Sequence, residues 1–282
     1  MGRLNIHDDF LINEKEFERE NLDFGKDSAL ISWHQDQTLL VISNPEANTI
    51  KKIQIQMPEP LSKCTCVIQM PNYWLFCYGN IDPFTGIACM ISTKDLTYKI
   101  LPSWKPCCCS GGTYYLESVY IFGGFKGPSM DLAMKFDIAK SEWKSLSALP
   151  KPSIKCSCAV FFRNILISGN DHNCLYVYDT DIDSYSVSEV KVNAYKNKYL
   201  FSGNQRAYIM QTSGDIYESD LKNPYFWKSI GRCELYGYYQ MGKIAYDNSF
   251  YFGAICSSDD TFYFYFVFDL IKKKVTQKKY FR

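Results

Sequence analysis

Residues 118–152 read SVYIFGGFKGPSMDLAMKFDIAKSEWKSLSALPKP, and this stretch decides the fold. An apolar run ends in the pair Gly123-Gly124, a second run ends in Asp137, and Trp143 stands six residues after that aspartate. Short apolar runs bounded by glycine, proline and small polar residues predict strands, because helices need longer stretches with a period of about 3.6 residues. With the residues just before it, the stretch predicts four strands at about 107–115, 118–123, 131–137 and 142–148.

The same two markers recur along the chain at a nearly constant spacing. Apolar runs end in glycine at Gly79, Gly123, Gly169 and Gly253, separated by 44, 46 and twice 42 residues. Other apolar runs end in a polar residue at Ser92, Asp137, Asp179, Asp220 and Asp269, and six residues after each stands Tyr98, Trp143, Tyr185, Phe226 or Val275. Two independent markers on one period indicate a tandem repeat of about 40–50 residues.

Four-stranded units of this length are typical of β-propeller blades. The aromatic content of 16% also favours strands, because aromatic side chains suit a half-buried pleated surface. We therefore predict an all-β chain, with a six-bladed β-propeller of four-stranded antiparallel blades over residues 28–282. The first unit offers only three strands, so we expect an incomplete first blade unless residues 1–27 supply its inner strand. That segment carries 8 acidic residues against 4 basic ones, and Asn13-Glu-Lys-Glu16 predicts a short helix there.

The third unit resembles the kelch repeat, whose pattern is a double glycine after an apolar strand and then an aromatic residue and a tryptophan with six residues between them. Phe136 and Trp143 have this separation, and Tyr178 and Tyr185 repeat it one unit later. The resemblance implies a kelch-type propeller in which the glycine pair permits a sharp turn where a Cβ would clash, and the aromatic residue of strand four packs between blades. The structural markers of the repeat are Gly79, Gly123, Gly124, Gly169, Gly253, Asp137, Trp143, Asp179 and Tyr185.

The charge balance and hydropathy exclude several function classes. Lys and Arg number 31 against 30 Asp and Glu, so no general attraction to nucleic acid is expected. The most apolar stretch, residues 261–268, is one strand long, whereas a membrane helix needs about 20 apolar residues. The first residues contain no apolar signal sequence. We expect a monomeric, cytoplasmic domain whose 12 cysteines are free thiols.

The cysteines form the most conspicuous cluster in the sequence. Cys64 and Cys66, Cys107 to Cys109, and Cys156 and Cys158 all fall on predicted first strands of successive blades, the strands that line the central channel in the kelch family. One interpretation is a soft-metal or redox site. The favoured one is small-residue packing, because tetrahedral zinc sites usually take Cys-x₂₋₄-Cys from loops. No metal ligand or cofactor is assigned.

Catalysis has little support in the sequence. The chain has 3 histidines, and none lies near a nucleophile motif. Arginine is scarce, and no glycine-rich phosphate loop is present. We therefore assign no catalytic residue and expect a chain that is not an enzyme.

The connections between second and third strands are expected to emerge together on one face and to carry partner-binding residues. The candidates on that face are Phe84, Phe125, Lys126, Met130 and His172, with Trp104 expected on the opposite face. These residues favour a non-catalytic protein–protein interaction module, a scaffold or adaptor. The resemblance implies cytoskeletal or ubiquitin-ligase-related partners. The alternatives are an enzyme or metal/redox protein that uses the channel, and a propeller that binds carbohydrate or a small ligand through an aromatic rim.

Overall fold

The computed structural model describes residues 29–33, 38–43, 49–54, 65–71, 74–81, 84–92, 97–188, 190–194, 198–203, 205–211, 214–233, 243–246, 249–255 and 262–281. The acidic segment 1–27, its predicted helix, His7 and His34 lie outside these ranges. Within them every regular element is a β-strand. No helix in this part of the chain is therefore long and apolar enough to span a membrane.

The strands form antiparallel sheets from consecutive stretches of the chain, which confirms the predicted all-β class. The first sheet has three strands, as predicted for the first unit: β1 (Ala29–Trp33), β2 (Thr38–Ser43) and β3 (Thr49–Gln54). The other five sheets have four strands each. They are β4 (Cys66–Gln69), β5 (Trp74–Ile81), β6 (Phe84–Ser92), β7 (Tyr98–Leu101); β8 (Gly111–Tyr115), β9 (Ser118–Phe122), β10 (Ala133–Asp137), β11 (Glu142–Ser145); β12 (Ser157–Phe161), β13 (Asn164–Ser168), β14 (Leu175–Asp179), β15 (Ser184–Ser188); β16 (Lys198–Gly203), β17 (Arg206–Gln211), β18 (Gly214–Asp220), β19 (Asn223–Cys233); and β20 (Lys243–Tyr246), β21 (Ser249–Ile255), β22 (Phe262–Asp269), β23 (Lys274–Phe281).

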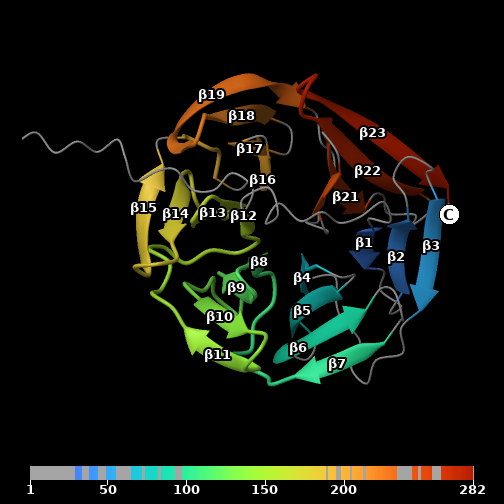
Figure 1. Ribbon diagram of the computed structural model, residues 1–282, viewed down its shortest axis with the longest axis vertical. Coiled ribbons are helices and arrows are strands. Elements are labelled where there is room, and N and C mark those ends of the chain that lie inside the picture. Colours follow the sequence, from blue (N-terminus) through green and yellow to red (C-terminus); the bar gives the residue numbers. More distant parts are fainter. Residues whose placement is uncertain are drawn as a thin grey trace, which may run out of the picture.

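The sheets follow one another around a centre, an arrangement consistent with a blade-type β-propeller (Figure 1). Strands β4, β8, β12 and β16 lie toward the centre, and β7, β11, β15 and β19 lie at the outside (Figure 1). Neighbouring sheets meet through their inner strands, β4 with β8, β8 with β12 and β12 with β16. Strand β1 contacts β20 and β21, so the first and last sheets are neighbours.

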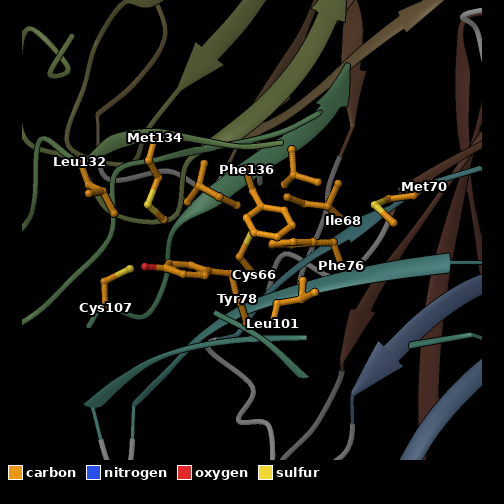
Figure 2. Close-up of a cluster of buried hydrophobic side chains, with 13 residues drawn as sticks. Cys66, Ile68, Met70, Phe76, Tyr78, Leu101, Cys107, Leu132, Met134 and Phe136 are labelled. Carbon is orange, nitrogen blue, oxygen red and sulfur yellow. The ribbon is translucent and has the colours of Figure 1, made fainter. Parts of the chain in front are cut away.

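The hydrophobic core lies between adjacent sheets. Figure 2 shows the cluster between the β4–β7 and β8–β11 sheets, where Phe76 and Phe136 pack with ring centroids 5.5 Å apart. Similar clusters fill the next three junctions along the chain. Apolar residues therefore face both sides of the inner strands, which explains the continuous rather than alternating apolar runs of the sequence.

The spacing of six residues in the repeat pattern corresponds to one cross-strand pair. Phe136 pairs with Trp143 and Tyr178 pairs with Tyr185, each across a tight hairpin. The Trp143 indole donates a hydrogen bond to Pro102 O of the preceding sheet (2.7 Å), and the Tyr185 hydroxyl donates one to Ser147 O (2.7 Å). These aromatic residues join neighbouring sheets.

The predicted marker of the fifth unit, Phe226, is wrong by one residue. A register shift between Ser219 and Asp220 displaces the strand, so that Ser219 pairs with Trp227. The Trp227 indole donates to Ser188 Oγ of the preceding sheet (2.7 Å), whereas Phe226 is 53% exposed. A β-bulge adds one residue to one strand, and the fixed spacing of the sequence pattern cannot reveal it.

The glycine markers differ in their roles. Gly79 and Gly123 have positive φ angles of 77° and 65°, and a Cβ on either would meet a backbone carbonyl of the next connection, Cys107 O or Ser153 O. The predicted sharp turn is confirmed at Gly123, which follows β9, whereas Gly79 lies within β5 at a register shift, so its strand does not end there as predicted. A Cβ on Gly169 would collide with the Ser153 side chain. Gly253 lies within β21, paired with Tyr265, so it does not end its strand as predicted.

The aspartate markers cap the hairpins between third and fourth strands. Asp137 Oδ1 accepts a hydrogen bond from Lys140 N (3.0 Å), and Asp179 Oδ1 accepts from Asp181 N (2.9 Å). Asp269 Oδ1 does the same for Ile271 N (2.9 Å). An aspartate that bonds the backbone two or three residues on stabilises a tight turn, which gives this position of the repeat a structural reason.

Candidate protein-interaction face

Two kinds of connection share one face of the ring. Because successive strands are antiparallel, each second-to-third connection and each link to the next sheet leave from the same edge. Trp104 N donates to Gly86 O (3.1 Å) and Gly124 N donates to Ser153 O (2.8 Å), which joins the two kinds directly. We call this surface the connection face and define it by residues 102–110, 123–132, 146–156 and 169–174. The prediction that Trp104 lies on the opposite face is therefore wrong.

The longest described second-to-third connection on this face, residues 123–132, is held at both ends by backbone hydrogen bonds. Phe125 N donates to Cys108 O (2.8 Å) and Cys108 N donates to Phe125 O (3.1 Å). At the other end Met130 N donates to Gly124 O (2.9 Å) and Ser153 N donates to Met130 O (2.9 Å). Between these anchors Lys126 and the two residues after it are exposed.

The candidates in this connection therefore have different roles. Phe125 and Met130 are half-buried, and Met130 packs against the hydrophobic cluster of Figure 2. Lys126 is the exposed candidate, and Lys126 N donates to Pro128 O (3.1 Å). Phe125 and Met130 therefore hold the base of the connection, and its tip, Lys126 to Pro128, is exposed to solvent.

Trp104 is the outer member of an aromatic stack. Its ring lies 6.4 Å from that of Trp143 at an interplanar angle of 21°, and Trp143 in turn lies 5.1 Å from the Tyr78 ring. The Tyr78 hydroxyl donates to Lys105 O (2.5 Å), which holds the same segment. Trp104 is 37% exposed, so a rigid aromatic surface reaches solvent.

The prediction of an accessible His172 is wrong. The side chain is 1% exposed, and its ring packs edge-on against Tyr176 with a centroid distance of 5.0 Å. His172 Nε2 lies 3.1 Å from Lys151 O and 3.2 Å from Pro152 O. Carbonyl oxygens only accept, so Nε2 carries the proton, and burial lowers the pKa of the ring. His172 holds the link between two sheets and does not face a partner.

Phe84 begins β6 and pairs with Ile81 of β5. The hairpin is therefore shorter than the predicted connection of residues 80–85. The Phe84 side chain lies outside what the structure describes.

Two further residues of this region were not predicted. Asp171 Oδ2 accepts hydrogen bonds from Ser129 Oγ (3.1 Å) and Ile154 N (3.1 Å), and thus joins two second-to-third connections and a link. Lys198 begins β16, is 2% exposed and donates from Nζ to Gly169 O (2.9 Å). Burial lowers the pKa of Lys198 to about 8. The sequence feature that could have indicated Lys198 is a lysine at the start of an apolar strand.

Four cysteines of the predicted cluster are divided between two hydrophobic junctions. Strand β8 begins at Gly111, so Cys107 to Cys109 precede it instead of lying on it as predicted; Cys109 has a φ of 54°, which turns the chain. Cys66 and Cys107 pack in the cluster of Figure 2, where the Tyr78 hydroxyl points toward Cys107. Cys156 and Cys158 pack in the next junction. Cys64 lies outside the residues described.

Burial also decides the chemistry of these thiols. It raises the pKa of Cys107 to about 11 and that of Cys156 to about 12. A protonated thiol is a poor nucleophile and a poor metal ligand. Among the residues in the structure's ranges, no three His, Cys, Asp or Glu side chains are placed to share one metal ion.

The connection face carries a local excess of positive charge. Lys105, Lys126 and Lys151 are exposed there, against one exposed acid, Asp131. Asp171 is occupied by the two hydrogen bonds described above. A protein surface with complementary negative charge would be attracted to this face.

Comparisons with known proteins leave the chain without an assigned relative. No family model matches it, and no curated protein matches it.

Proposed function

We propose that this chain is a kelch-type, six-bladed β-propeller over residues 28–282 that binds a protein partner through its connection face and catalyses no reaction. The support for the fold is the order of the sheets, the cross-strand pairs Phe136–Trp143 and Tyr178–Tyr185, and the glycine turns. The partner classes that the kelch resemblance implies, cytoskeletal or ubiquitin-ligase-related proteins, place the proposed function in the cytoplasm.

The observation that carries the proposal is the preorganised connection of residues 123–132. Four backbone hydrogen bonds fix its ends, while Lys126 to Pro128 stand exposed between them. A loop that is already ordered loses little conformational entropy when a partner binds, so more of the contact energy appears as affinity.

The neighbouring residues supply the chemistry of an interface. Trp104 presents a rigid, partly exposed ring, and tryptophan is among the residues that dominate binding energy at interfaces. The cations of the same face, Lys105, Lys126 and Lys151, favour an acidic partner surface. The metal or redox alternative has less support, because Cys107 and Cys156 are buried in the junctions between sheets and their pKa values are raised.

The test is quantitative affinity capture from the source cells with the full chain as bait. We expect Trp104→Ala/Lys126→Glu to lose the specific partner by more than tenfold. The matched control is Tyr98→Ala/Lys140→Glu, since Tyr98 is also 37% exposed and Lys140 is an exposed lysine away from the connection face. If every specific partner survives the first variant, or if the control loses the same partner, this face is not the interface.

A further inference from the structure

Among the described strands, the outermost strand of each sheet has one backbone edge without a paired strand, and one of these edges differs from the others. The outermost strands are β3, β7, β11, β15, β19 and β23. Free edges are templates for pairing with another strand, and natural proteins usually block them with lysine, proline or a bulge. Five of the six carry lysine, and β19 also has Pro224 and register shifts. Strand β15, Ser-Tyr-Ser-Val-Ser, has no charge and no proline.

The backbone of β15 is regular along its full length. All five residues pair with β14 without a register shift. Its two faces carry exposed apolar groups: Val187 is 57% exposed, and the Tyr225 ring, 38% exposed, reaches over from β19 to place its hydroxyl 2.9 Å from Ser186 Oγ. Phe226 beside it is 53% exposed. An added strand would therefore gain backbone hydrogen bonds and cover apolar surface at this edge.

The order of side chains in β15 fits a second β15 better than an arbitrary peptide. Small and large residues alternate in the same order from either end, so an antiparallel copy centred on Ser186 sets serine opposite serine and Tyr185 opposite Val187 of the partner subunit. Cross-strand pairs of an aromatic and a β-branched residue, and of two hydroxyl residues, stabilise antiparallel sheets.

The sequence on either side of the strand has like charges three residues from Ser186, Asp183 before it and Glu189 after it, and opposite charges five residues from it. Asp181 lies five residues before Ser186 and Lys191 five residues after it, and both are exposed. An antiparallel copy brings Asp181 toward Lys191 of the partner subunit twice, once at each end. Asp183, next to the strand, already accepts hydrogen bonds from Ser147 N (2.9 Å) and the Tyr178 hydroxyl (2.8 Å).

We infer that two copies of this chain pair through the free edges of β15, antiparallel and about a two-fold axis at Ser186. A two-fold interface uses the same surface on both copies, as a strand of this alternating order requires. Five paired residues with few flanking contacts bury less than the roughly 1,200 Å² of a standard interface, so the dimer dissociates in the micromolar range. At concentrations below this range the chain is a monomer, as the sequence predicts. The connection face stays free in both copies, so this inference does not depend on the proposed function.

Sedimentation equilibrium of the full chain from about 1 to 200 μM tests the inference. The mass should rise with concentration from 32.7 kDa toward twice that value. Ser186→Lys puts two lysines against each other on the axis and should weaken the dimer at least tenfold. Ser145→Lys, at a position of the outer strand β11 that is also exposed, should change it less than twofold. Far-UV circular dichroism and the melting temperature verify that both variants fold.

A charge exchange tests the register independently of the strand itself. Lys191→Asp should weaken the dimer severalfold, and Asp181→Lys/Lys191→Asp should restore it, because the opposite charges meet again with their places exchanged. Three results overturn the inference: a wild-type chain that stays monomeric at 200 μM, a dimer that Ser186→Lys leaves intact, or a β15 edge that captures a different protein while the chain remains monomeric.

Discussion

The two faces of the ring are built on different principles. The connection face consists of long segments that cross from one sheet to the next and are tied by backbone hydrogen bonds, such as Gly124 N to Ser153 O (2.8 Å). The opposite face, which we call the hairpin face, consists of tight turns at residues 115–118, 137–142, 161–164, 179–184 and 220–223. Residues with positive φ, among them Leu116, Ser141 and Phe162, close these turns.

This difference indicates which face has residues free to contact a partner. A tight hairpin needs most of its residues for its own geometry, and its aspartates are used as caps. A long connection can fix its ends and leave its tip free, as residues 123–132 do. We therefore expect the stability of the chain to depend on the anchors of the connection face and not on its tip.

The largest expected effect comes from the base of the connection. A Cβ at Gly123 would lie 2.5 Å from Ser153 O in a backbone with φ 65°, so Gly123→Ala should cost about 3–5 kcal/mol of unfolding free energy. Gly127 has a φ of 87° but no atom within 4 Å of its Cβ position, so Gly127→Ala should cost about 1–2 kcal/mol. Urea unfolding of the two variants measures both changes in unfolding free energy. Equal changes would contradict the distinction between the base and the tip of the connection.

The next prediction compares two aspartates, Asp171 in a half-buried link between connections and Asp179 in an exposed hairpin cap. Asp171→Ala leaves Ile154 N without its acceptor in a half-buried position, and should cost about 1–3 kcal/mol. Asp179→Ala frees Asp181 N in an exposed turn where water can replace the carboxylate, and should cost less than about 1 kcal/mol. Thermal unfolding of the two variants side by side gives the ranking, and the reverse order would contradict it.

A pH dependence specific to the connection face follows from His172. Burial lowers the pKa of His172, so the unfolded chain binds a proton that the folded chain does not. The contribution of neutral His172 to the free energy of unfolding is complete above the pKa of about 6.5 that histidine has in the unfolded chain. This contribution decreases as the pH falls below that value, until the pKa of His172 in the folded chain is reached. His172→Gln should lack this dependence. The difference in unfolding free energy between the two chains, measured from pH 7.5 to 5, should shrink toward acid.

On the hairpin face the corresponding window is more acidic. The backbone hydrogen bond from Lys140 lowers the pKa of Asp137, so this cap contributes above the unfolded pKa of about 3.9 and is lost as the pH falls through the folded value. Asp137→Asn should therefore differ from wild type at pH 6 and converge with it near pH 2 in urea titrations. A difference that grows toward acid would refute the cap.

The smallest expected effect on stability is at the tip. Lys126 is exposed and its side chain fixes no neighbour described above, so Lys126→Ala should change the unfolding free energy by less than about 0.5 kcal/mol. The same substitution should weaken partner capture. A loss of stability comparable to that of Gly123→Ala would show that the tip belongs to the scaffold.

Much of the architecture was predictable, because short-range rules act on single units. The predicted spans 118–123 and 131–137 of the third unit lie within a few residues of β9 and β10, and the spacing of Phe136 and Trp143 corresponds to one cross-strand pair. The errors have two causes, irregular strand pairing within a sheet and contacts between units. Trp227 replaces Phe226 through a bulge, and His172 is buried by the carbonyl groups of a link that comes twenty residues earlier.

The sequence alone determined the period, the four-strand unit and the turn chemistry. Glycine at positive φ and aspartate caps are local requirements, and in a repeat they recur at fixed positions of the sequence. The tertiary structure decided which side chains remain accessible. It buried His172 and most of the described cysteines, brought Trp104 onto the same face as Lys126, and left β15 as the one uncharged outer edge among those described. Accessibility depends on what neighbouring sheets cover, and that is set by packing between units distant in the chain.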